Sequence, residues 1–168
     1  MILKFSGGIL IVVSAVYSGF SVEAKGRKRI KEIENINKFI IKLKENTLNT
    51  LDSFNDSVAK ISKEMDFVTI KCFVALSNNV DITKFNDFSK EINDIPNQPL
   101  LESDIQILND FVHMIDTRNL NTVISAMDKC NDKLEHIINC ESKEFLSRCR
   151  LYRNMLIWAG ILMTILLI

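Results

Sequence analysis

Apolar residues recur at steps of three and four along both flanks of the chain, which is the period of an amphipathic helix. The first stripe consists of Ile30, Ile33, Ile36, Ile40, Leu43, Leu48 and Leu51. The second consists of Leu120, Val123, Met127, Asn131, Leu134, Ile138, Glu141, Phe145, Cys149 and Tyr152, with two polar interruptions. These stripes predict two long helices, the second running unbroken for more than thirty residues.

Shorter amphipathic segments lie between the two stripes, around residues 58–65, 67–74, 82–92 and 105–115. Pro96 and Pro99 mark a turn, because proline removes a backbone donor and clashes with a preceding helical turn. Ser103 and Gln106 match a capping box at the start of the next helix, and Asn119 is a candidate cap for the last one. Together with the lack of glycine in residues 27–159, these segments predict an all-α fold, a bundle of about six helices.

Both ends of the chain are apolar and uncharged. Phe5–Val22 provides eighteen uncharged residues, and Asn154–Ile168 provides fifteen. At 1.5 Å per residue these are about 27 and 22 Å long, against roughly 30 Å of hydrocarbon in a bilayer. We therefore predict an N-terminal transmembrane anchor in residues 1–25, a helical bundle in residues 26–153, and a C-terminal transmembrane segment in residues 154–168.

Small residues within the two apolar segments give faces on which helices pack closely in lipid. Ala15 and Gly19 form one small-xxx-small pair, and Gly160 begins another. We expect these three residues at helix contacts, although small residues that occur by chance in a short apolar segment account for the pattern equally well.

Basic residues border both apolar segments and predict the topology. They are Lys25, Arg27, Lys28, Arg29 and Lys31 at the first segment and Arg148, Arg150 and Arg153 at the second. Dense basic flanks stay in the cytoplasm, so both termini should point outward and the bundle should be cytoplasmic. The alternative is an exported protein with a cleaved signal peptide, since Val22-Glu23-Ala24 resembles a cleavage site.

The middle of the chain is acidic, with thirteen Asp or Glu and five Lys between Glu45 and Asp116. The densest part comprises Asp81, Asp87, Glu91, Asp94, Glu102 and Asp104. We predict that Asp87, Glu91 and Asp94 contact a basic protein partner, because charge of one sign steers association. A solvated acidic surface is the plainer explanation. Because the basic residues cluster at the membrane ends, nucleic acid is not an expected partner.

The sequence offers little for catalysis. Phosphate-binding loops need glycine, which residues 27–159 lack, so a Walker-type nucleotide site is excluded. Four cysteines show no Cys-x-x-Cys spacing, and the pair His136 and Cys140 supplies too few ligands for zinc. We expect no catalytic, cofactor-binding or metal site and no small-molecule substrate.

Four short segments resemble the stage III sporulation protein AB family of endospore-forming bacteria. They are Leu3–Gly8, Ser18-Gly19-Phe20 before the basic block, Ile107–Phe111, and the leucine-rich end Gly160–Ile168. The chain departs from the family at Ser53-Phe54 and Ile115-Asp116.

The resemblance implies a soluble part like the six-helix cytoplasmic domains of platform proteins in type II secretion and type IV pili. It further implies a structural, non-enzymatic role in the channel complex between mother cell and forespore, on the mother-cell side. The implied partners are the cytoplasmic ATPase, stage III sporulation protein AA, and other membrane proteins of that complex. A membrane-tethered helical adaptor unrelated to sporulation is the alternative.

Overall fold

The computed structural model describes residues 2–50, 54–78, 88–115 and 120–167, and within these ranges the chain is helical with no strand. The elements are α1 (Ile2–Thr50), α2 (Phe54–Ile61), α3 (Ile70–Asn78), α4 (Phe88–Asn93), α5 (Glu102–Ile115), α6 (Leu120–His136), the π-helical turn η2 (Ile137–Glu141) and α7 (Ser142–Leu167). The predicted all-α fold is confirmed.

The chain divides into two compact units. Arg29–Ile138 forms one, here called the bundle, and Met1–Lys28 with Asn139–Ile168 forms the other, here called the two-helix unit. The boundaries between the two units, after Lys28 and after Ile138, both fall within residues 26–153, which were expected to form a single domain. The described part of the bundle holds six helical pieces, namely the C-terminal part of α1 and the whole of α2 to α6.

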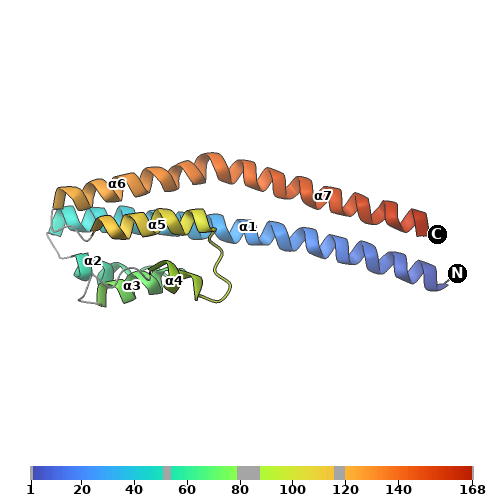
Figure 1. Cartoon of the computed structure of the whole chain (residues 1–168), viewed down its shortest axis with the longest axis horizontal. Helices are drawn as coiled ribbons and strands as arrows, with labels where there is room; N and C mark the ends of the chain where they lie inside the picture. The colour runs from blue at the N-terminus through green and yellow to red at the C-terminus, as the bar shows by residue number, and fades with distance from the viewer. Residues whose placement is uncertain (1, 51–53, 79–87, 116–119, 168) are drawn as a thin grey trace. The chain divides into compact units, whose positions relative to one another are not determined.

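Two layers of helices build the bundle (Figure 1). The C-terminal part of α1 lies beside α5 and α6, to which it is joined by the ion pairs Arg29–Asp104 and Lys44–Asp128. The short helices α2, α3 and α4 form the second layer. Three phenylalanine rings join the layers. Phe39 of α1 lies 4.8 Å from Phe73 of α3, which lies 5.5 Å from Phe88 of α4, measured between ring centroids. Tilted ring pairs of this kind stabilise a core by about 0.5–1.5 kcal/mol beyond their buried area.

The first apolar stripe faces this core as its spacing predicts. Ile33, Ile36, Ile40 and Leu43 are all buried, whereas Leu48 near the end of α1 is exposed. Burying one such side chain stabilises the fold by roughly 1.5–3 kcal/mol. The stripe on α1 is therefore a main support of the bundle.

The predicted long final helix is present as α6 and α7, which follow one another with a single change of helix type between them. Between α6 and α7 the chain forms the π-helical turn η2, which takes up an extra residue per turn. As a result the buried position there is Ile137, while Ile138 is only partly buried.

Helix α5 begins earlier than its expected capping box. The carboxylate of Asp104 accepts a hydrogen bond from the backbone N–H of Leu101 at 2.9 Å, so Leu101 and Asp104 cap the helix instead of Ser103 and Gln106. The turn at Pro96 and Pro99 lies between α4 and α5, as predicted. Asn119 lies outside the described residues.

Within the two-helix unit, α1 and α7 run antiparallel in close contact. A Cβ atom added at Gly19 would lie 2.8 Å from Cγ of Arg153, and one added at Gly26 would lie 2.5 Å from Cε1 of Phe145. These glycines are seven residues apart, on one face of α1. Their missing side chains let large side chains of α7 approach the backbone.

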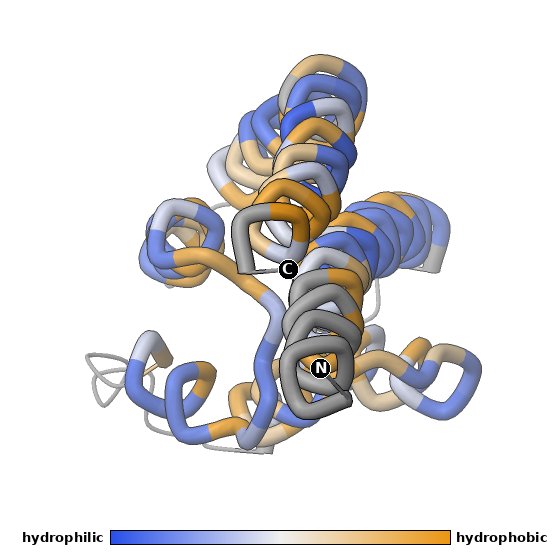
Figure 2. Tube along the Cα trace, turned by 90° about the vertical axis from the view of Figure 1, so that its right-hand side faces the viewer, coloured by the Kyte–Doolittle hydropathy of each residue, from blue (hydrophilic) through white to orange (hydrophobic). Residues whose placement is uncertain are grey.

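Among the residues that the structure describes, no helix is both long enough and apolar enough to cross a membrane. The last described turns of α7, next to the C-terminus, are apolar and are coloured orange in Figure 2.

Candidate functional site: a charged cluster beside two exposed apolar faces

Glu23 is the centre of a charged cluster in the two-helix unit. Its side chain is only 8% exposed. One carboxylate oxygen accepts a hydrogen bond from Arg27 Nη2 at 2.8 Å, and the other accepts one from Arg153 Nη1 at 2.5 Å. Glu23 lies between Gly19 and Gly26 on the face of α1 that meets α7. A single carboxylate thus ties the two helices together where both apolar segments begin.

The charges around Glu23 keep it ionised. The hydrogen bond from Arg27 lowers the pKa of the Glu23 carboxyl, burial opposes that shift, and the charges of Arg153 and Arg150 lower the pKa further. The guanidinium of Arg153 also lies 5.4 Å from the centre of the Phe20 ring, a cation–π distance. The cluster of Phe20, Glu23, Arg27 and Arg153 will be called the Glu23 cluster.

Two apolar faces extend from the Glu23 cluster toward the chain ends. On α1 the face consists of Leu10, Val13, Tyr17 and Phe20, and on α7 it consists of Met155, Trp158, Leu162 and Ile165. Both sets follow steps of three, four and three, so each lies along one side of its helix. Every member is more than half exposed, with Tyr17 at 78%. Exposed apolar stripes of this length mark a surface that meets lipid or protein.

Most of the basic residues expected at the membrane interface are exposed. These are Lys25, Arg27 and Lys28 on α1, Arg148 and Arg150 on α7, and Lys31 in the bundle. Arg148 pairs with Glu144 at 2.5 Å, and Arg153 is partly buried against Glu23.

Arg29 departs from that expectation, because its side chain is only 6% exposed. Its guanidinium donates two hydrogen bonds of 2.7 Å to the carboxylate of Asp104, so it anchors α1 to α5 and does not face lipid headgroups. One turn further along α1, the buried Glu32 accepts hydrogen bonds of 2.7 Å from the backbone N–H and the hydroxyl of Thr69, just before α3. Sequence reasoning missed both contacts. The sequence does contain a signal for their burial. Arg29 and Glu32 lie four residues before Ile33 and Ile36, so they share the buried face of α1.

The expected partner-binding carboxylates fall in and around α4. Glu91 and Asp94 are both exposed, and Asp87 lies outside the described residues. Asp104, which belongs to the same acidic segment of the sequence, is buried in its pair with Arg29 and contributes nothing to a docking surface.

The residues expected at helix contacts in the membrane lie in the two-helix unit. Gly19 packs against Arg153, and Gly160 of α7 is buried. The side chain of Ala15 lies outside the described residues.

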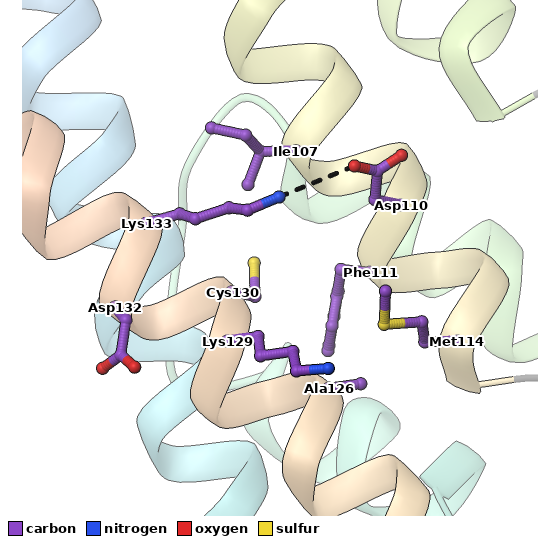
Figure 3. Close-up of a pocket in the computed structure, with 9 residues that line it drawn as sticks. All are labelled: Ile107, Asp110, Phe111, Met114, Ala126, Lys129, Cys130, Asp132 and Lys133. Atoms are coloured by element: carbon purple, nitrogen blue, oxygen red, sulfur yellow. Dashed lines mark ion pairs between the residues drawn. The ribbon is translucent and has the colours of Figure 1, made fainter.

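A groove of about 270 Å³ lies between α5 and α6 in the bundle (Figure 3). Phe111, Ala126 and Cys130 line its interior, and Asp110 and Lys133 form an ion pair of 3.6 Å at its edge. Burial raises the pKa of the Cys130 thiol to about 12, so the thiol stays protonated at neutral pH. The groove therefore offers apolar surface and fixed charges, but no activated nucleophile.

The four cysteine thiols differ in solvent exposure. Cys72, Cys130 and Cys149 are buried, and Cys140 is exposed. Burial raises the pKa of Cys72 to about 11, and it raises that of Cys149 as well. Among the described residues no group of three or more His, Cys, Asp or Glu side chains could hold a metal ion.

The described fold defines an all-α protein with a helical bundle and a two-helix unit. The family model for stage III sporulation protein AB matches residues 4–168. The chain therefore belongs to this family and is a stage III sporulation protein. Neither a search of curated proteins nor a search of solved structures gave a match.

Proposed function

We propose that the chain is a non-enzymatic structural component of a sporulation channel complex, anchored in the membrane by both ends of the two-helix unit. The bundle would lie in the cytoplasm of the mother cell and dock a cytoplasmic ATPase, with other membrane proteins of the complex as neighbours. The membership of the stage III sporulation protein AB family supports the cellular setting.

The observation that carries the anchoring proposal is the pair of apolar faces beside the Glu23 cluster. Both faces lead away from the cluster toward a chain end, and both lie within the uncharged segments Phe5–Val22 and Asn154–Ile168. The charges of the Glu23 cluster are too costly to place in hydrocarbon, and its member Arg27 is exposed, so the cluster fits a position just outside the hydrocarbon. Helices that run antiparallel and turn polar at the same level fit two spans entering the membrane from one side.

The distribution of charge supports the docking proposal. The two-helix unit holds eight Lys or Arg and three Asp or Glu, whereas the bundle holds thirteen Lys or Arg and eighteen Asp or Glu. A bundle of net negative charge fits a basic protein surface, and α4 offers the exposed carboxylates Glu91 and Asp94. Such charges mainly set the association rate and its dependence on salt.

A binding measurement between the full chain and the purified ATPase of the same complex tests this docking. Glu91→Lys with Asp94→Lys should weaken binding at least several-fold, and raising the salt concentration should weaken binding of the unaltered chain. The control is Glu45→Lys with Asp132→Lys, which makes the same change of charge at exposed positions on α1 and α6. Binding that resists both the α4 substitutions and salt would refute this docking surface.

A further inference from the structure

We infer that the two-helix unit selects anionic phospholipids, and that Lys25, Lys28 and Arg150 are the residues that contact their headgroups. This inference rests on the proposed membrane anchoring and adds the kind of lipid that surrounds the anchor. It follows from which of the border charges are neutralised within the protein and which are not.

Internal partners neutralise part of the basic border. Glu23 binds both Arg27 and Arg153, and Glu144 binds Arg148. Among the described residues, by contrast, no carboxylate lies within ion-pair distance of Lys25, Lys28 or Arg150, and all three side chains are exposed. Within the two-helix unit, these three charges therefore form the part of the border that is open to an external anion, and the exposed Lys31 belongs to the bundle.

The positions of Lys25, Lys28 and Arg150 along the helix axes match the headgroup layer of a bilayer. Lys25 and Lys28 are two and five residues past Glu23, and Arg150 is three residues before Arg153, on the side away from the apolar faces. At 1.5 Å per residue, all three lie within about 8 Å of the Glu23–Arg153 pair. The polar layer on each side of a bilayer is roughly 5–8 Å thick. The open charges therefore lie where phosphate groups would lie if the apolar faces fill the hydrocarbon.

The exposed aromatic residues support lipid rather than protein as the occupant of this surface. Tyr152 on α7 is exposed between Arg150 and Arg153, and Tyr17 on α1 and Trp158 on α7 are exposed about 9 and 7.5 Å further into the apolar segments. Tyrosine next to basic residues is typical of the membrane interface, because its ring carries a polar hydroxyl on an apolar body. Basic residues near an anionic surface each add about 1 kcal/mol of attraction.

The chain contains a single tryptophan, Trp158, which reports directly on its lipid neighbours. Trp158 is 66% exposed and lies five residues from Arg153, about 7.5 Å along the helix. Brominated acyl chains quench tryptophan only on contact. The full chain would be reconstituted in phosphatidylcholine bilayers that contain equal fractions of either brominated phosphatidylglycerol or brominated phosphatidylcholine.

We expect brominated phosphatidylglycerol to quench Trp158 more, giving a relative association constant of roughly two to five at low salt. Lys25→Gln with Lys28→Gln and Arg150→Gln should bring this ratio to about one, while brominated phosphatidylcholine still quenches and so shows that the variant inserts. The control Lys63→Gln with Lys71→Gln and Lys129→Gln removes three exposed charges from the bundle and should leave the ratio unchanged.

Equal quenching by both lipids in the unaltered chain would overturn the lipid selectivity while leaving the anchor intact. A loss of preference in the control variant would also overturn it, because the effect would then come from overall charge. If neither lipid quenched Trp158, the anchoring proposal itself would fail.

Discussion

The buried ion pair between Arg29 and Asp104 is the contact that ties α1 to the start of α5. Asp104 is 1% exposed, and its carboxylate accepts hydrogen bonds from the guanidinium and from the backbone N–H of Leu101. A pair that is satisfied in this way offsets its own desolvation, but removing one partner leaves a buried charge without its counter-ion. Asp104 thus serves both as a helix cap and as the counter-charge of Arg29.

We therefore expect Asp104→Ala to lower the free energy of unfolding by roughly 3–5 kcal/mol. Asp110→Ala, which removes only the exposed partner of Lys133 at 3.6 Å, should cost less than about 1 kcal/mol. The measurement is the urea midpoint of the full chain in detergent, followed by circular dichroism. Equal midpoints for the two variants would show that the Arg29–Asp104 pair does not hold the bundle together.

At the scale of single residues, the sequence predicted the burial of apolar side chains better than the burial of charged ones. Ile33 and Ile36 were placed correctly because burial of an apolar side chain needs only the right spacing. Arg29 and Glu32 share that face, but their burial depends on Asp104 and Thr69, which lie 75 and 37 residues away. A single sequence does not show which distant residue will supply the matching hydrogen bonds.

At the scale of the elements, the pairing of α1 with α7 depends on small residues opposite large ones. Gly26 faces the ring of Phe145 so closely that no side chain fits between them. The long helices and the turn at Pro96 and Pro99 followed from the periodicity and from the backbone chemistry of proline. The π-helical turn Ile137–Glu141 and the early start of α5 did not, because each is set by local hydrogen bonds that the apolar pattern does not encode.

Gly26→Leu should lower the thermal midpoint of the full chain, because overpacking of a close contact costs about 1–3 kcal/mol. Adding Phe145→Ala should restore much of this loss, since the smaller side chain makes room for the new one. Ala24→Leu, at an exposed position two residues away on α1, serves as the control and should change little. If the thermal midpoint of the double variant is only what the two single changes add up to, the Gly26–Phe145 contact does not set the packing of α1 against α7.

For the whole molecule, the separation of charge matches the proposed roles of the two units, which are membrane anchoring by the two-helix unit and protein docking by the bundle. Twenty-one basic and twenty-one acidic residues cancel overall, yet the two-helix unit has an excess of basic residues and the bundle an excess of acidic ones. The proposed placement of a basic unit beside anionic lipid, and of an acidic unit facing a protein partner, is compatible with a chain of zero net charge. The composition alone conceals this arrangement.

The proposed anchoring places the two-helix unit in the membrane with its basic border on the cytoplasmic side. Cys140 provides a natural probe, because it is exposed while the other three thiols are buried with raised pKa values and hold few reactive thiolates near pH 7. The measurement is labelling of the full chain by a membrane-impermeant maleimide in right-side-out and in inverted bacterial membrane vesicles. We expect labelling in inverted vesicles only, and its loss in Cys140→Ser. Labelling of Cys140 in right-side-out vesicles, or a chain that does not stay with the membranes, would contradict the proposed anchoring.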